Sequence, residues 1–398
     1  MSYAGGRVIH DADSHIMESP DWLYEYADAA TKDRMRSALD FNGTKEAEDD
    51  PDGFFAKALA KQRDPEFRAG DEAEVMLRKN WLAPGSFLKE DRPAALDLLG
   101  FKSQLVFNTF ANGALVRAEH GDDEDFAYGL AAAHNRAIVD FCSVDERLLP
   151  VGYVPLMSVE RACSFVSSAI ESGAAALMVA SACPRTHSPS HVGLDPVWRA
   201  AEEAGLPIVF HVGGEGRPMP AAYFENGLPP VPDFHGGDGN FRSISYMSIP
   251  YPVMQTLSVL VIDGVFMRFP SLRFGAIELG ATWLPGLMKN LDSSAEAFRR
   301  NEERLQKLDL RPSEYLQRQL RVTPYPHEDA GWVIQQCGED VALFSSDYPH
   351  VEGGRNPLKR FDRSLSEAGV SDIAVHKFYA ANFEDLMGAA LPASVAVA

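Results

Sequence analysis

The sequence predicts a single (β/α)8 barrel. Three observations favour this fold: eight short apolar runs rich in β-branched residues occur in series, amphipathic helical stretches separate many of them, and most runs are apolar on consecutive positions. An open, doubly wound sheet would normally carry a glycine-rich phosphate-binding turn after its first strand, and the sequence DADSHIME found there does not resemble one. The expected strands are residues 8–12, 104–109, 149–154, 175–180, 207–212, 272–279, 320–323 and 341–345.

Helices between the strands are indicated by apolar side chains at helical spacing. Residues 124–144 show this spacing along their whole length. Residues 195–205, with the sequence DPVWRAAEEAG, end at a glycine that is followed by Leu206 and Pro207, which together form a helix stop signal. This alternation of strand and helix is the repeating unit of a parallel barrel.

Two long connections interrupt the alternation. Residues 31–95 are rich in charged side chains, and we expect a helical, lid-like insertion over the barrel mouth after the first strand. Residues 213–250 are dense in glycine and proline and predict a long loop after the fifth strand. We assign residues 1–390 to one domain and residues 391–398 to a flexible tail.

The composition is that of an acidic globular protein. The 398 residues are 45% hydrophobic and 24% charged, and 37 Lys plus Arg against 57 Asp plus Glu give a formal net charge of −20. This charge disfavours binding to nucleic acid or to an anionic membrane, which leaves a small-molecule substrate as the expected partner. No leader-like start and no apolar run of about 18 residues is visible, so we expect a cytoplasmic protein.

The cysteines support the same compartment. Cys142, Cys163, Cys183 and Cys337 are scattered without paired spacing. Neither a disulfide framework nor a cysteine zinc site is therefore expected, and reduced thiols in a cytoplasm are the simplest interpretation.

Polar side chains stand at or just after the ends of several expected strands. In a parallel barrel these ends meet at one mouth, where barrel active sites are built. Neutral imidazole and ionised carboxylate are the ligands that a hard or borderline divalent cation prefers, so we predict a site for zinc, manganese or iron. Reading the strand ends in order gives the candidate ligands Asp13, His15, His211, Glu278 and Asp347.

The first of these ends lies within DADSHIME, residues 11–18. Alternate residues of a strand point to one side, so Asp13 and His15 are expected to share a cavity and to bind the metal. Asp11 lies further down the same face, where we expect a supporting role. Glu18 begins the next segment and is either a metal ligand or a plain acid at a helix start, two interpretations that the sequence supports equally.

The other candidates each have a structural alternative. His211 ends an apolar strand before two glycines, and its alternative is a buried core histidine. Glu278 would be an ionised group within an apolar strand, which is costly unless an arginine or a metal pairs with it. Asp347 precedes His350 within one turn, and its alternative is a turn-capping aspartate. Together, Asp347 and His350 are the candidate residues for moving a proton.

Three further residues are candidates for contact with the substrate. Arg185 follows the fourth strand and is suited to holding a substrate carboxylate, with an ordinary loop salt bridge as an equal alternative. His191 lies in a loop rich in proline and serine, and Trp283 follows the sixth strand. The sequence contains neither a Ser-His-Asp nucleophile elbow nor a P-loop.

Four segments carry a resemblance to a known family: DADSHIMESPDWL, PSHVGLDPVWRAAEEAGLPIVFHVGG, FPSLRFGAIELGATWLP and VALFSSDYPHVEGG. In these the chain resembles the amidohydrolase superfamily, in its amidohydrolase-related branch, which includes the aminocarboxymuconate semialdehyde and resorcylate-type decarboxylases. The resemblance implies a metal-bearing (β/α)8 barrel. Its ligands would fall here on Asp13, His15, His211 and Asp347.

Two positions depart from this branch. It commonly has His-x-His, or Glu-x-His in some decarboxylases, where this chain has Asp13-x-His15. Many members carry a histidine followed by glycines on the sixth strand, usually for proton transfer or substrate contact, where this chain has Glu278 before Leu279 and Gly280. The added carboxylates shift the expected metal toward manganese or iron and permit two ions bridged by Glu18 or Glu278.

These observations predict a metal-dependent hydrolase or decarboxylase that acts on a small carbonyl or carboxylate compound of aromatic or polyketide-like type. A non-heme iron oxygenase with one or two irons on the same barrel is an alternative. A non-catalytic binding barrel is a second alternative. The apolar, proline-rich residues 213–250 are suited to packing on a second copy, so a homodimer is also a candidate.

Overall fold

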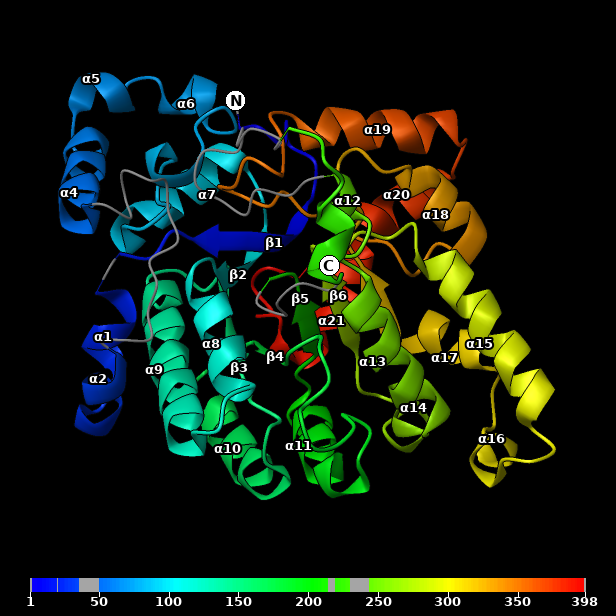
Figure 1. Ribbon diagram of the computed structural model, residues 1–398. Helices are drawn as coiled ribbons and strands as arrows, with labels where there is room; N and C mark the ends of the chain where they lie inside the picture. The colour runs from blue at the N-terminus through cyan, green and yellow to red at the C-terminus, as the bar shows by residue number, and fades with distance from the viewer. Residues whose placement is uncertain (1, 20, 36–49, 214–218, 230–242, 397–398) are drawn as a thin grey trace.

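The computed structural model describes residues 2–19, 21–35, 50–213, 219–229 and 243–396, and its centre is one curved parallel sheet (Figure 1). Seven strands pair in chain order, each parallel to the next, and every strand residue is buried. The (β/α)8 fold class is thereby confirmed. The strands are β1 (His10–Ile16), β2 (Ser103–Asn108), β3 (Leu148–Tyr153), β4 (Ala176–Met178), β5 (Ile208–His211), β6 (Phe274–Ile277) and β7 (Leu320–Val322).

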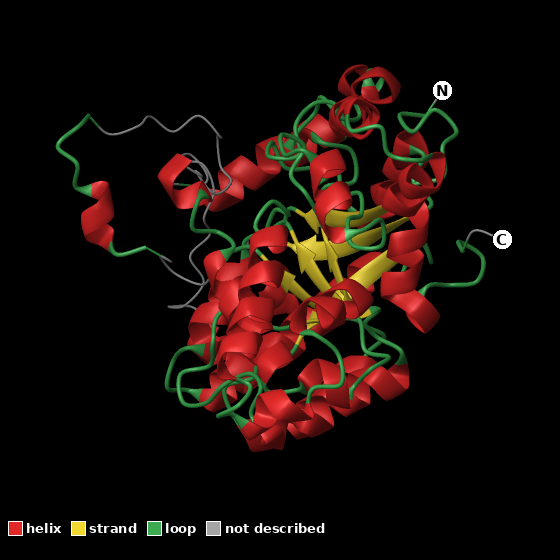
Figure 2. Ribbon diagram, turned by 90° about the vertical axis from the view of Figure 1, so that its right-hand side faces the viewer, coloured by secondary structure: helices red, strands yellow, loops and turns green. Residues whose placement is uncertain are grey.

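Helices surround the sheet, as Figure 2 shows with the strands in yellow inside a layer of red helices. The two helices expected from spacing are present as α9 (Glu124–Cys142) and α11 (Asp195–Ala204), and α11 ends at Gly205 with a left-handed φ of 66°. The other main helices of the barrel are α7 (Arg92–Leu99), α8 (Ala111–Glu119), α10 (Val159–Glu171), α13 (Tyr251–Ile262), α14 (Val265–Arg268), α15 (Leu284–Phe298), α16 (Glu303–Lys307), α17 (Pro312–Gln319), α18 (Ala330–Cys337), α19 (Pro357–Glu367), α20 (Asp372–His376) and α21 (Asn382–Met387).

The first strand runs further than expected. It was predicted at residues 8–12, whereas β1 continues to Ile16, so that Asp13 and His15 lie within the strand rather than after it. The extension has hydrogen-bond partners on both sides: β2 on one, and residues 341–350, here called the closing segment, on the other. Its register shifts between Asp11 and Ser14, which re-aims the side chains around Asp13.

The eighth expected strand, residues 341–345, is not a regular strand, and this part of the prediction is wrong in detail. The closing segment makes only isolated bridges, Ala342 to Val322 of β7 and Tyr348 to Ser14 of β1. The ring is nevertheless closed, because the Leu343 N–H donates to the Val322 carbonyl at 3.1 Å and the Ala12 N–H donates to the Phe344 carbonyl at 3.1 Å. Between the two bridges, Asp347 adopts a left-handed φ of 52°.

The insertion after β1 is helical where it is described. It contains α1 (Trp22–Tyr26), α2 (Ala29–Met35), α4 (Pro51–Gln62), α5 (Pro65–Arg68), α6 (Asp71–Glu74) and the 3-10 turns η1 (Asn80–Leu82) and η2 (Lys89–Asp91), while residues 36–49 lie outside the described residues. Trp81 forms a small apolar cluster with Met17 at the end of β1 and with Ala58 of α4. The insertion is thereby packed on the barrel beside the carboxyl end of β1.

The long loop and the tail are described in part. Within residues 213–250, the described residues include the 3-10 turn η4 (Ala221–Phe224) and α12 (Ser243–Tyr246), and the rest of that prediction lies partly outside the described residues. Leu391 and Val395, in the segment expected to be a flexible tail, are buried against the core, so the flexibility stays a prediction. All four cysteines are free thiols. Among the described residues, no helix is long and apolar enough to cross a membrane.

A buried polar network lies beneath the carboxyl end of β1. Asp11 accepts hydrogen bonds from the N–H and the hydroxyl of Ser346 at 2.7 and 2.6 Å, and from the Gln104 amide at 2.9 Å. Gln104 in turn accepts from the fully buried Arg92, which also donates to the His15 carbonyl at 3.0 Å. Burial raises the pKa of Asp11 to about 7, although the bonds from Ser346 and Gln104 oppose the rise. The network joins α7, β2, β1 and the closing segment.

Replacement of Asp11 by alanine should destabilise the fold strongly. The change leaves the buried donors of Ser346 and Gln104 without an acceptor, so we expect the free energy of unfolding to fall by about 3 kcal/mol. Urea denaturation followed by circular dichroism measures it. Asp21→Ala is the matched control, because Asp21 is exposed and its side chain caps nothing, and its effect should stay within about 0.5 kcal/mol. Equal effects of the two changes would contradict the role of the network.

Candidate metal centre

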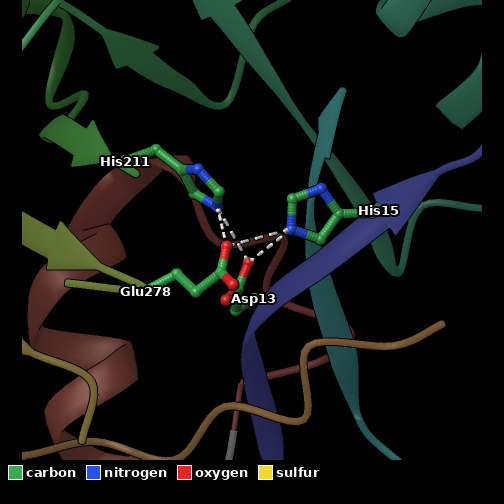
Figure 3. Close-up of side chains that lie close together, drawn as sticks. All are labelled: Asp13, His15, His211 and Glu278. Atoms are coloured by element: carbon green, nitrogen blue, oxygen red, sulfur yellow. Dashed lines mark hydrogen bonds and ion pairs between the residues drawn. The ribbon is translucent and has the colours of Figure 1, made fainter. Parts of the chain in front are cut away.

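Six residues expected at the strand ends meet in one buried cluster. Asp13 and His15 come from β1, His211 ends β5, Glu278 directly follows β6, and the closing segment supplies the others. Figure 3 shows four of them with their polar atoms directed at one point. Two overlapping sets have ligand atoms that all lie within 4.8 Å of one another: Asp13, His15, His211 and Glu278, and His15, Glu278, Asp347 and His350.

Backbone carbonyls orient both histidines of the first set. His15 Nδ1 lies 3.0 Å from the carbonyl oxygen of Asn108, and His211 Nδ1 lies 2.9 Å from that of Val212. A carbonyl only accepts hydrogen bonds, so Nδ1 carries the hydrogen in both rings, and Nε2 of a neutral ring presents its lone pair. Burial and the nearby His350 lower the pKa of His15, which favours its neutral form. This is the arrangement of a metal-binding histidine.

The two Nε2 atoms face carboxylate oxygens. Asp13 Oδ1 lies 3.1 Å from His15 Nε2 and 3.3 Å from His211 Nε2 (Figure 3). Glu278 Oε2 lies 3.4 Å from His211 Nε2 and 3.9 Å from His15 Nε2. A lone pair and an anionic oxygen repel each other at these distances, and a divalent cation between them removes the repulsion.

Buried polar atoms without a hydrogen-bond partner point to the same place. They include Asp13 Oδ2, His15 Nε2 and Asp347 Oδ2. Asp13, Glu278 and Asp347 also line a cavity of about 10 Å³, which is the size of a single water or ion. These carboxylate oxygens, together with the Nε2 atoms of His15 and His211 that lie within 4.8 Å of Asp13 and Glu278, fit a divalent cation of the manganese, iron or zinc type.

Two of the carboxylates are held in strained backbone conformations. The φ angles are 53° at Glu278 and 52° at Asp347, in the left-handed region that side chains other than glycine rarely adopt. Each such residue costs about 1–3 kcal/mol and persists only where its surroundings impose it. The Glu278 N–H donates to the Thr323 hydroxyl at 2.8 Å, and its carbonyl accepts from the Tyr325 hydroxyl at 2.6 Å. The Asp347 N–H donates to the Asp13 carbonyl at 2.9 Å.

His350 is held between two partners. Its Nδ1 lies 2.9 Å from Asp347 Oδ1, and its Nε2 lies 2.9 Å from the Thr109 hydroxyl. Its ring centre is 4.0 Å from that of His15. Because a carboxylate accepts hydrogen bonds, Nδ1–H donates to Asp347 and the pair is arranged to share a proton.

Glu18 lies outside both sets, so the sequence-based expectation of a ligand is not supported. Its carboxylate accepts hydrogen bonds from the backbone N–H groups of Thr109, Phe110 and Ala111, at 3.0, 3.1 and 3.0 Å. Burial raises its pKa, and these bonds oppose the rise. Glu18 therefore caps the start of α8, a helix that begins more than ninety residues later in the chain.

Of the three residues expected to contact the substrate, two are exposed and have partners within their own loops or nearby loops. Arg185 is exposed and donates to Asp122 at 2.5 Å, which is the loop salt bridge that the sequence left as its alternative. His191 is exposed, and its Nδ1 accepts from the Gly193 N–H at 3.0 Å to cap a 3-10 turn, η3 (Val192–Leu194). Only Trp283 lies close to the cluster in the chain, and its indole N–H donates to the Leu279 carbonyl at 3.0 Å and the Gly280 carbonyl at 2.8 Å.

Sequence reasoning missed several residues that line the cavity, among them Thr323, Tyr325 and Glu352. Thr323 directly follows β7, so the strand-end rule used for the other residues would have found it. Tyr325 and Glu352 follow strand ends at a greater distance and carry no such signal.

Comparisons with known proteins agree with this fold. No curated protein matches the chain. A solved amidohydrolase from Mycobacterium avium subsp. paratuberculosis is 21% identical over 96% of this chain and 100% of its own, with a TM-score of 0.71. The 5-carboxyvanillate decarboxylase from Novosphingobium aromaticivorans, solved with bound manganese, is 20% identical over 96% and 97%, with a TM-score of 0.61. The 2,6-dihydroxybenzoate decarboxylase from Rhizobium is 15% identical over 96% and 98%, with a TM-score of 0.59.

A family model described as amidohydrolase matches residues 11–386 of the chain. The match begins at Asp11 and includes every residue of the cluster. The chain belongs to this amidohydrolase family.

Proposed function

We propose that the protein is a metal-dependent decarboxylase of a small aromatic carboxylate. The observation that carries the proposal is the cluster itself, in which histidine nitrogens and carboxylate oxygens lie within 4.8 Å of one another, while three of the carboxylates also line a cavity of ion size. Asp13, His15, His211 and Asp347 would hold the cation, with Glu278 as a further ligand. The solved neighbours that decarboxylate 5-carboxyvanillate and 2,6-dihydroxybenzoate support the reaction, and the manganese in the first supports the metal. An oxygen-rich ligand set suits manganese better than zinc.

A bound divalent cation would orient the substrate and polarise its carboxylate or carbonyl oxygen. The chain's own residues would then manage the proton. When the carbon–carbon bond to the carboxylate breaks, the electron pair stays on the substrate carbon, which needs one proton. Asp347 and His350 share a hydrogen bond of 2.9 Å and would deliver that proton, with Thr109 keeping the imidazole in place.

Hydrolysis is the second candidate, because the same centre serves it with a different proton path. Asp347 next to His350 is also suited to accept a proton from an attacking water. We prefer decarboxylation, because the solved neighbours whose substrates are named, such as those for 5-carboxyvanillate and 2,6-dihydroxybenzoate, are decarboxylases.

We further propose that the insertion acts as a lid of the single domain. The Asn80 N–H donates to the Pro349 carbonyl at 2.9 Å, and the Tyr348 hydroxyl donates to the Pro84 carbonyl at 2.6 Å, so the insertion is tied to the closing segment beside Asp347. A cytoplasmic location, a small-molecule substrate as the partner and a homodimer stay proposals based on composition.

Loss of a ligand should remove the metal, whereas loss of Glu18 should not. We expect Asp13→Asn and Glu278→Gln each to weaken manganese binding by about tenfold or more, because each removes an anionic donor. Glu18→Gln is the matched control, since it changes a buried glutamate that caps a helix. Elemental analysis and manganese titration of the folded variants measure the effect. Full metal content in both ligand variants would exclude these two residues as ligands.

Carbon dioxide should be released without oxygen. We expect the manganese-loaded protein to decarboxylate a member of a hydroxybenzoate panel under nitrogen, with His350→Asn lowering kcat by about 10²–10⁴-fold while metal content is kept. Released carbon dioxide and elemental analysis are the two measurements. A requirement for oxygen together with bound iron would favour the oxygenase instead, and turnover of esters or amides without carbon dioxide would favour the hydrolase.

A further inference from the structure

The metal cavity is too small to enclose a whole organic molecule. At about 10 Å³ it accommodates one ion or water, whereas cavities that bind small molecules measure about 300–1,000 Å³. A cavity of about 330 Å³ lies next to it and shares Tyr325 with it. We call it the aromatic cavity, because its lining includes four aromatic side chains: Tyr246, Tyr251, Trp283 and Tyr325.

Among the described residues that line it, the aromatic cavity offers no unpaired charge. Its charged lining residue is Glu328, whose carboxylate accepts hydrogen bonds from the Tyr325 N–H at 2.8 Å and from the Thr282 N–H and hydroxyl at 3.1 and 2.7 Å. The Glu328 carboxylate is therefore used in hydrogen bonds to the surrounding loops rather than being available to a ligand. The remaining walls from α12, α13 and α15 are mainly apolar. Such a lining favours an uncharged aromatic or alkyl group.

Tyr325 lines both the metal cavity and the aromatic cavity. Its hydroxyl donates to the Glu278 carbonyl, and burial raises its pKa, so the hydroxyl remains a donor at neutral pH. The ring packs against Tyr246 and stacks on His327, with ring centres 5.4 Å apart in both pairs. His327 Nε2 lies 3.0 Å from the Tyr246 hydroxyl, which holds α12 as a wall of the cavity. Leu279 and Gly280, next to Glu278 in the chain, form another part of the wall.

We propose that the aromatic cavity binds an uncharged aromatic or alkyl part of the substrate, while the carboxylate end of the same molecule lies at the metal centre. The inference rests on the proposed function, and it narrows the substrate class to carboxylates that carry a second, apolar group. Tyr325 lines both cavities and would therefore contact both parts of the bound molecule.

Gly286 of α15 allows a direct test. It lines the aromatic cavity, and a Cβ built on it meets no atom within 4 Å, so a larger side chain fills space without a clash at its root. Replacing a helical glycine also favours the helix, by about 1 kcal/mol for alanine, so the variants should fold. Gly286→Phe fills the cavity, and Gly286→Ala is the matched control.

The probes are 4-phenylbutanoate and butanoate, titrated into manganese-loaded protein by calorimetry. We expect 4-phenylbutanoate to bind the native protein and Gly286→Ala about tenfold more tightly than butanoate, because a phenyl group is buried. In Gly286→Phe this advantage should disappear while butanoate binding is unchanged. An equal affinity of the two probes for the native protein, or an advantage that survives in Gly286→Phe, overturns the proposal.

A neutral probe separates this proposal from the proposed function. We expect 2-naphthol to bind metal-free and manganese-loaded protein alike and to lose its site in Gly286→Phe. Suppose that 2-naphthol gives this result while butanoate binds equally well with and without manganese. The proposed function is then wrong, and the aromatic cavity is still a ligand site. If 2-naphthol does not bind, or if Gly286→Phe converts a native dimer into monomers, the cavity is not a ligand compartment and the proposal is overturned.

Discussion

Buried carboxylates and imidazoles that converge on one point are the constraint on which the rest of the structure depends. The carbonyls of Asn108 and Val212 place the hydrogen of each histidine on the outer nitrogen, so that the inner nitrogens face the oxygens of Asp13 and Glu278. Carboxylate oxygens and imidazole lone pairs that face one another in a protein interior repel each other, and burying them costs free energy unless a cation lies between them. The fold must therefore be stable enough elsewhere to hold the group together, and the cation then adds to the stability.

The closure of the barrel and the construction of the site use the same hydrogen bonds. The closing segment joins β7 to β1 by a few backbone hydrogen bonds and two isolated bridges, and Asp347 lies between these bridges with a left-handed φ. The Asp11 carboxylate accepts a hydrogen bond from the Ser346 N–H, and the Asp347 N–H donates to the Asp13 carbonyl. Two candidate ligands that are far apart in the chain are thus linked by a main-chain hydrogen bond. A change that loosens this closure would also move a candidate ligand, so fold stability and the geometry of the cluster are coupled here.

Much of the site followed from one rule, that polar residues at the carboxyl ends of parallel strands meet at one mouth. This rule predicted that Asp13, His15, His211, Glu278 and Asp347 lie close together. The alternation of side chains along a strand and the parallel order of the strands decide which side chains converge. It did not place Glu18, whose partners are backbone N–H groups of a distant helix start. Arg185 was equally ambiguous, because a guanidinium binds a nearby loop acid as readily as a substrate.

The sequence by itself determined the barrel, the kinds of ligand and the β1 motif, because apolar periodicity and residue type are local properties. Only the tertiary structure decided the hydrogen positions of the histidines, the irregular path of the closing segment and the strained backbone at Glu278 and Asp347. It also revealed the aromatic cavity, whose walls come from α12, α13 and α15 together with Tyr325. These features depend on which residues distant in the chain come into contact, and no local pattern contains that information.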